Sequence, residues 1–229
     1  MKSSSLFVEF YGLPGCGKST VSHLVAERLR NNGCSVNEPS YKLDHGKPVW
    51  RKIKKLWLTL FFLVFHHRTF KIVRRIVSDN GYKGMTQLEQ IVNVIQKIYI
   101  YREQTFSNII IWDQGLVQAA ISLSLNGKME AAANLNKLVE LIPSDIRFIN
   151  ILLDVDENLS LQRMAMRKTN DSRVERIKDK EKKHQMMSCF VANIDSISKS
   201  IDVFIVDGKI NLEQLANQIY DIVFHRLCL

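Results

Sequence analysis

The sequence predicts an α/β protein in which helices cover both faces of a five-stranded parallel sheet. Five apolar runs of strand length alternate with stretches of helical periodicity, at about residues 6–11, 34–38, 108–112, 147–154 and 201–206. The third and fourth runs lack regular polar alternation, which is typical of parallel strands buried on both faces. We therefore expect a three-layer αβα arrangement, with ligands bound beyond the carboxyl ends of the strands.

The first strand leads into a glycine-rich turn with the pattern of a phosphate-binding loop. The run is Gly12-Leu-Pro-Gly-Cys-Gly-Lys-Ser19, and a helix is expected to start at Lys18, with apolar residues at Val21, Leu24, Val25 and Leu29. In such a loop, backbone N–H groups and the positive end of the helix point at one anion. The pattern predicts a P-loop that binds nucleotide phosphates through Gly12, Pro14, Gly15, Cys16, Gly17, Lys18, Ser19 and Thr20.

The chemistry of the loop predicts ATP and Mg²⁺ as cofactors. Lys18 is a mobile positive charge that can follow the β- and γ-phosphates, and the Ser19 hydroxyl is a hard oxygen ligand for Mg²⁺. A side chain at Gly15 or Gly17 would obstruct the anion. Asp113 ends the third strand, where it is expected either to hold Mg²⁺ or its water, or to accept a proton from the acceptor.

The helix before the third strand carries an arginine on its apolar face. Arg102 continues a stripe formed by Leu88, Ile91, Ile95 and Ile98, so it is expected to point inward. A buried guanidinium needs an anion, which could be a substrate phosphate or the carboxylate of Glu9 in the first strand. The sequence leaves both partners open.

A second group of arginines follows the fourth strand. Asp154-Val-Asp-Glu predicts a capped helix start, and Arg163 and Arg167 lie four residues apart on one helix face. With Arg173 they suit a lid at about 163–180 that neutralises charge during phosphoryl transfer. The alternative is a basic face exposed to solvent.

Length and composition favour one domain in a reducing compartment. The 229 residues contain 46% hydrophobic and 24% charged residues, which is ordinary for a globular protein, and no linker divides residues 1–229. The four cysteines lack metal-ligand spacing, and one of them lies in the phosphate loop. The first residues lead directly into a strand, so we expect cytoplasmic placement.

The net charge of +9 is concentrated in one segment. No acidic residue lies between Asp44 and Asp79, a stretch that contains nine lysines and arginines and the apolar run 56–65. This run is too short to cross a bilayer. The segment 49–77 is expected either to cover the acceptor site, with its apolar side on the core, or to contact an anionic membrane surface.

These motifs resemble the thymidylate kinase branch of the P-loop nucleoside and nucleotide kinases. The resemblance rests on Leu152-Leu-Asp-Val-Asp156, on Leu161-x-Arg163, on Arg167-x-x-x-Asp-x-Arg-x-Glu175, and on Val206-Asp-Gly208 before an amphipathic helix. It implies transfer of the γ-phosphate of ATP to a small acceptor, with a helical acceptor region at about 40–105 that includes Tyr41. It also implies that Arg102 contacts an acceptor monophosphate.

One departure from this family concerns the acceptor. The family usually places an arginine directly after the third-strand aspartate, and here that position is Gln114. The resemblance implies a nucleotide or a nucleoside as the acceptor, and Gln114 tilts the expectation toward a non-standard one. The alternatives are a sugar or lipid acceptor, or a nucleotide-switch ATPase without acceptor. No recognition motif for sequence-specific nucleic acid accompanies the charge, and a homodimer is left open.

Overall fold

The protein is built on one parallel sheet. A computed structural model describes residues 5–44, 57, 59–103, 109–166 and 174–227. The strands are β1 (Leu6–Gly12), β2 (Val36–Asn37), β3 (Ile109–Trp112), β4 (Arg147–Asp154) and β5 (Phe204–Asp207), in the spatial order β2-β3-β1-β4-β5. All four pairings between neighbours are parallel. The five strands predicted from the sequence are confirmed, with the second reduced to two residues.

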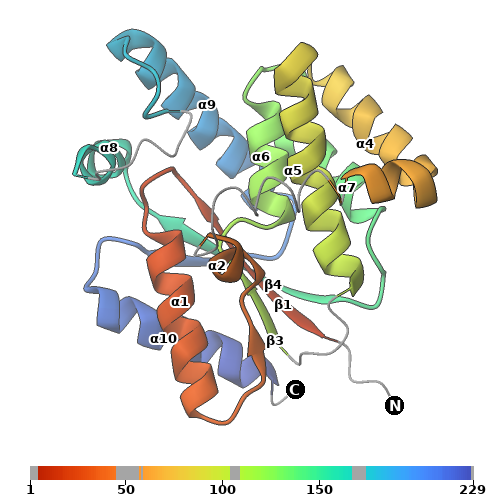
Figure 1. Cartoon of the computed structure of the whole chain (residues 1–229). Helices are drawn as coiled ribbons and strands as arrows, with labels where there is room; N and C mark the ends of the chain where they lie inside the picture. The colour runs from red at the N-terminus through yellow and green to blue at the C-terminus, as the bar shows by residue number, and fades with distance from the viewer. Residues whose placement is uncertain (1–4, 45–56, 58, 104–108, 167–173, 228–229) are drawn as a thin grey trace.

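Helices cover both faces of the sheet, which gives the three layers (Figure 1). The helices on one face are α1 (Lys18–Asn31) and α10 (Leu212–Leu227). The other face and its surroundings hold α4 (His67–Asp79), α5 (Gly84–Glu103), α6 (Leu116–Ser124), α7 (Ala131–Val139) and α9 (Lys180–Ser198), and the short helices α2 (Pro39–Asp44) and α8 (Glu157–Ala165) lie near the carboxyl ends of the strands.

The alternation of side chains in β1 divides the core into two parts. Leu6, Val8 and Phe10 pack with apolar side chains of α1 and α10. Phe7 and Tyr11 point to the opposite face and pack with α5, α6 and α9. Every residue of β1 is buried, as expected for the central strand of a sheet that is covered on both sides.

The apolar stripe of α5 differs in part from the expected one. Ile91, Ile95 and Ile98 are buried as predicted, but Leu88 is 47% exposed. Tyr101 is fully buried instead, because it stacks on Phe7 of β1 at 4.5 Å between ring centroids. The core of this layer therefore lies toward the C-terminal half of α5.

The carboxyl ends of the strands place several functional candidates at one edge of the sheet. Gly12 ends β1, Asp113 directly follows β3 and Asp154 ends β4. Glu38 follows β2 at the same edge. Within the described residues, no helix has the length and apolar character needed to cross a membrane.

Candidate active site

The phosphate loop connects β1 to α1 and depends on glycine at two positions for different reasons. Gly15 has a φ of +88°, and a Cβ there would come within 2.8 Å of both the Ser160 carbonyl oxygen and Met164 Cγ. Gly17 has a φ of +102°, but a Cβ there would meet no other atom within 4 Å. Within the protein itself, Gly15 is therefore required by space and backbone conformation, and Gly17 by conformation alone.

The Lys18 ammonium lies inside the curve of this loop. Its Nζ donates to the carbonyl oxygens of Gly12 at 3.0 Å and Leu13 at 2.9 Å, and it lies 3.4 Å from Cys16 Sγ. Both the lysine and Cys16 are buried. The loop thus holds a positive charge among neutral acceptors, where an incoming phosphate would supply its first anionic partner.

Ser19 and Asp113 meet at the mouth of the loop. The Ser19 hydroxyl donates to Asp113 Oδ2 at 2.5 Å. Asp113 is 5% exposed, and its Oδ1 is buried without a hydrogen-bond partner among the described residues. An unsatisfied buried carboxylate oxygen beside a hydroxyl is a donor set that suits Mg²⁺. The two residues predicted as metal ligands are therefore adjacent and fit the ion.

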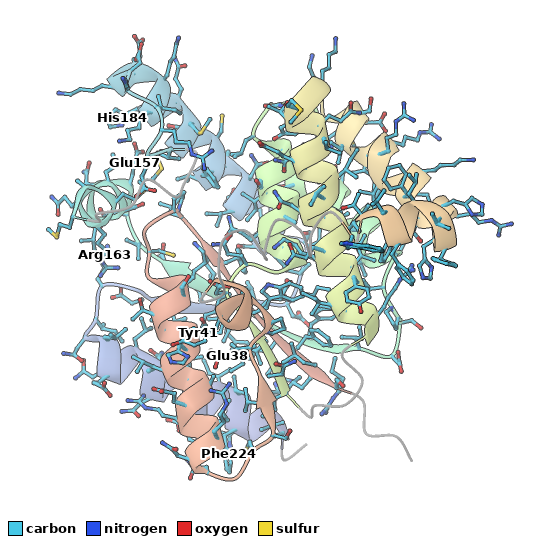
Figure 2. All side chains as sticks on the ribbon, viewed as in Figure 1. Glu38, Tyr41, Glu157, Arg163, His184 and Phe224 are labelled. Carbon is cyan, nitrogen blue, oxygen red and sulfur yellow. The ribbon has the colours of Figure 1, made fainter. Side chains whose placement is uncertain are left out.

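A cavity of about 410 Å³ opens beside this pair, between α1 and the segment after β2. Ser19, Thr20 and Asp113 line it, together with Tyr41 and Glu38. Tyr41, which lies beside Glu38 in Figure 2, stacks on the imidazole ring of His23 with centroids 3.8 Å apart. The phosphate loop, the candidate metal ligands and the expected substrate residue Tyr41 thus share one cavity.

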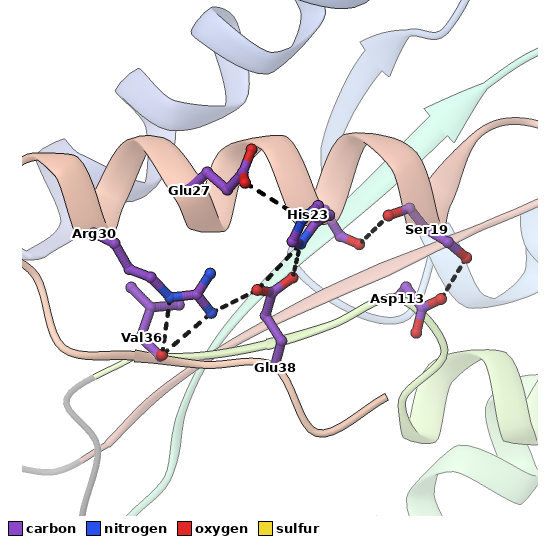
Figure 3. A network of polar contacts seen from close by, with 8 residues as sticks. Ser19, His23, Glu27, Arg30, Val36, Glu38 and Asp113 are labelled. Carbon is purple, nitrogen blue, oxygen red and sulfur yellow. Dashed lines mark hydrogen bonds and ion pairs between the residues drawn. The ribbon is translucent and has the colours of Figure 1, made fainter. Parts of the chain in front are cut away.

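Glu38 is a site residue that the sequence analysis missed. Its carboxylate is buried and accepts from Arg30 Nη2 at 2.5 Å, and it lies 3.0 Å from His23 Nδ1 (Figure 3). These contacts fix the carboxylate on the wall of the cavity that Asp113 also lines. The available signal was an acidic residue directly after a short strand, the same pattern that identified Asp113.

The comparisons with known proteins concern the fold. No protein-family model matches the sequence, and no curated protein matches it. A structure of deoxyadenosine kinase from M. mycoides with products dCMP and dCDP bound has a TM-score of 0.56 and 15% identity, covering 96% of this chain and 99% of that chain. A structure of deoxyadenosine kinase from M. mycoides with bound dATP has a TM-score of 0.54 and 17% identity, covering 95% and 98%. The fold is that of the P-loop nucleoside kinases. The thymidylate-kinase-like branch stays a prediction.

The first lid arginine contacts the outer side of the P-loop. It lies on α8, which Asp156 caps by accepting from the Leu159 backbone N–H at 2.8 Å, as expected; this bond lowers the pKa of Asp156.

From α8, Arg163 donates to the carbonyl oxygens of Cys16 at 3.2 Å and Gly208 at 3.0 Å. Arg163 therefore joins the loop to the turn after β5. The other lid candidates, Arg167 and Arg173, lie outside the described residues.

Pro14 is also held from α8. Its carbonyl oxygen accepts from the hydroxyl of Ser160, one helical turn before Arg163. On the opposite side of the loop, Gln118 Oε1 accepts from the Gly12 backbone N–H at 3.3 Å. Gln118 of α6 and Ser160 of α8 therefore position the first part of the P-loop, a role that the sequence analysis did not foresee for either residue.

Arg102 does not pair with Glu9, which was one of its two expected partners. Arg102 donates through Nε and Nη2 to the Leu141 carbonyl oxygen at 3.0 and 2.8 Å, and through Nη2 to Thr69 Oγ1 at 3.3 Å. Partial burial lowers the pKa of Arg102. The guanidinium lies between α4, α5 and the end of α7, where it donates to one carbonyl and one hydroxyl oxygen. The carbonyl is that of Leu141, in the turn directly after α7.

Glu9 is instead held at the start of α6. Its carboxylate accepts from the Val117 backbone N–H at 3.1 Å, from the Leu116 N–H and from the Tyr101 hydroxyl. Burial raises the pKa of Glu9 despite these hydrogen bonds. The contact fixes the turn that contains Asp113, so Glu9 has a positioning role at the edge of the site.

Gln114 lies in that turn with an exposed side chain. Its backbone carbonyl oxygen accepts from Lys97 Nζ, and the same ammonium lies 5.3 Å from the centre of the Trp112 ring. The exposed Gln114 side chain thus lies at the position where the thymidylate kinase family, which the sequence resembles, usually carries an arginine. Lys97 is a cation near this position that the sequence analysis did not single out.

Proposed function

We propose that this protein is an ATP- and Mg²⁺-dependent kinase that transfers the γ-phosphoryl group of ATP to a hydroxyl group of a small acceptor, with nucleosides as the leading class. The observation that carries the proposal is the contact between Ser19 and Asp113 at the mouth of the P-loop, beside a cavity that Glu38 also lines. The deoxyadenosine kinases with the same fold support a nucleoside as the first acceptor to test.

The donor side requires positioning and neutralisation of charge rather than covalent chemistry. The P-loop residues Gly12 to Thr20 bind the phosphates of ATP, and Lys18 leaves its carbonyl acceptors to pair with them. Ser19 and Asp113 hold Mg²⁺, which when bound neutralises phosphate charge. Arg163 supports the loop through the Cys16 carbonyl. We retain Arg167 and Arg173 as cations that approach the triphosphate.

The acceptor side favours an uncharged hydroxyl compound over a monophosphate. Among the described residues that line the cavity there is no lysine or arginine, and two of them are the buried carboxylates of Glu38 and Asp113. Arg102, the cation that a monophosphate acceptor would need, does not line this cavity and donates to the Leu141 carbonyl. Arg30 pairs with Glu38, whereas Asp113 has no cationic partner among the described residues, and such carboxylates can orient a hydroxyl and take its proton.

We assign the two roles that the sequence left open for Asp113 to two different carboxylates. The Ser19 contact favours Asp113 as the metal ligand, and Glu38 is then the carboxylate that accepts the proton of the acceptor hydroxyl. Tyr41 and Gln114 border the acceptor, and we retain the helical region at about 40–105 as the acceptor region, of which Ser40 and Tyr41 line the cavity. The single domain spans residues 1–229.

A screen of acceptors tests the proposal directly. Purified protein is incubated with ATP and Mg²⁺ together with nucleosides, nucleoside monophosphates or sugars, and the release of ADP is measured for each. We expect the largest stimulation with a nucleoside, and we expect Lys18→Ala to abolish transfer and weaken ATP binding. ADP release that no acceptor stimulates would favour a nucleotide switch, and wild-type transfer by Lys18→Ala would contradict the assignment.

A further inference from the structure

The helical segment before α4 and the outer face of α4 expose an unusual number of large apolar side chains. Seven of the sixteen exposed large hydrophobic residues in the described part of the chain fall between residues 57 and 72. They are Trp57, Leu60, Phe61, Leu63, Val64, Phe65 and Ile72. Apolar patches of this kind on a globular protein mark sites of interaction with another surface.

The helical segment 59–65 contacts the core through only a narrow stripe. Thr59 and Phe62 are buried, at the helical spacing of three residues, and the other five side chains point away from the core. Phe65 is 69% exposed, and its ring centroid lies 5.0 Å from that of Phe61. The two phenylalanines therefore form an aromatic pair on the outside of the molecule.

The exposed face of α4 adds positive charge next to this aromatic pair. Arg68, Lys71, Arg74 and Arg75 are all exposed, and within the described residues none of the four makes an ion pair. The nearest acid along the helix, Asp79, lies 3.9 Å from Lys137. We define the seven apolar residues and these four cations as the 57–75 surface. α4 packs against α5 and lies on the outer side of the helical layer (Figure 1).

The structure divides this segment between two faces. Phe62, Val73, Ile76 and Val77 pack on the core, as expected for a covering segment, whereas seven other large apolar side chains are exposed. The cavity beside Ser19 and Asp113 has no lining residue from the 57–75 surface. These seven side chains are therefore left exposed by the described part of the chain, which makes them candidates for contact with an external surface.

We infer that the 57–75 surface binds an anionic lipid bilayer, with Trp57, Phe61 and Phe65 inserted at the interface and the α4 cations against lipid headgroups. A mixture of aromatic and basic side chains without acids is the composition that such an interface favours. A second copy of this chain fits less well, because a two-fold contact would bring eight unpaired cations together without a compensating acid.

Vesicle binding tests the inference without nucleotide, so its result is independent of the proposed kinase activity. The full chain is sedimented with phosphatidylcholine vesicles, with or without phosphatidylglycerol, at low and high salt. We expect binding only to the anionic vesicles and release by salt. Phe61→Ser/Phe65→Ser should weaken binding about tenfold or more, and Arg68→Glu/Arg75→Glu by about twentyfold or more.

Matched changes on other faces serve as controls. Phe224→Ser on α10 removes an exposed aromatic ring, and Lys180→Glu/Lys182→Glu on α9 makes the same change of charge. Both should bind vesicles as the wild type does. Absence of wild-type binding, equal binding to neutral vesicles, or equal loss in the controls would overturn the inference. So would a concentration-dependent dimer in solution that Phe61→Ser/Phe65→Ser abolishes.

Discussion

The Ser19 hydroxyl donates to Asp113 Oδ2 at 2.5 Å, although 94 residues separate the two positions along the chain. Ser19 lies in the first turn of α1, which follows β1, and Asp113 follows β3, which pairs with β1 in parallel. Because parallel neighbours end at the same edge of the sheet, the contact follows from the strand order. The second oxygen of Asp113 remains buried and unsatisfied within the described structure, which gives it a specific place for a cation.

Replacement of Asp113 should weaken Mg²⁺ binding at the active site. Asp113→Asn keeps the shape but removes the negative charge, and we expect kcat to fall by about a hundredfold or more. The Mg²⁺ concentration for half-maximal ADP release should rise. Asp221→Asn, an exposed change on α10, is the matched control. Unchanged Mg²⁺ dependence in Asp113→Asn would remove Asp113 as a metal ligand.

Replacement of Glu38 should slow phosphoryl transfer to the acceptor and leave ATP binding nearly unchanged. If Glu38 accepts the proton of the acceptor hydroxyl, Glu38→Gln should lower acceptor-dependent kcat by about 10²–10⁴-fold. ATP binding, measured by calorimetry, should change little because the carboxylate does not belong to the P-loop.

Glu27→Gln separates this role from a disturbance of His23. Glu27 Oε1 lies 3.5 Å from His23 Nε2, so its loss perturbs the same imidazole from the solvent side. We expect near wild-type turnover in Glu27→Gln. A similar loss of kcat in both variants would show that the position of His23, and not the Glu38 carboxylate, is what matters.

Two glycines with positive φ separate the cost of an unfavourable backbone conformation from the cost of a steric clash. One is Gly33, after α1, and the other is Gly15 in the P-loop. Gly33→Ala places a Cβ at a φ of +79° in open space, so it should cost about 1–2 kcal/mol of unfolding free energy. Gly15→Ala has a similar φ but meets the Ser160 carbonyl and Met164, and should cost about 1–3 kcal/mol more. It should also abolish ATP binding, which Gly33→Ala should retain. Equal unfolding free energies in the two variants would contradict the close approach.

The parts of this structure that the sequence predicts are those with a strong local signal. The strands at β1, β3 and β4 are runs of apolar residues, and the P-loop carries its own glycine pattern, so their places follow from nearby residues alone. The predicted strand at about 34–38 already ended at Glu38, but no local motif distinguishes a carboxylate on the cavity wall from an ordinary acidic residue after a strand.

Partners that come from distant segments could not be predicted in this way. The helical spacing correctly places Arg102 toward the interior, but its acceptor is a backbone carbonyl 39 residues away that the turn after α7 supplies. Glu9 likewise depends on the start of α6, which is 107 residues from it. Periodicity shows which face of an element is buried, whereas tertiary packing decides which polar group each buried side chain meets.

The buried carboxyl of Glu9 should make stability depend on pH. Because its pKa is raised in the folded state, its stabilising contribution is complete below the unfolded pKa of about 4.3 and is lost as the pH rises through the folded pKa. Glu9→Gln cannot titrate. The unfolding free energy of the wild type relative to this variant should therefore fall with rising pH, by up to about 1.4 kcal/mol per pH unit.

Urea unfolding of both proteins between acid and neutral pH measures this difference. Glu140→Gln, an exposed change at the end of α7, is the control and should run parallel to the wild type over the same range. The expected slope belongs to Glu9 because Glu9→Gln removes one titrating carboxyl and leaves its wild-type partners, the Val117 and Leu116 N–H groups and the Tyr101 hydroxyl, unchanged in sequence. If the unfolding free energies of the wild type and Glu9→Gln ran parallel with pH, the pKa of Glu9 would be the same in the folded and unfolded states, which would contradict the prediction.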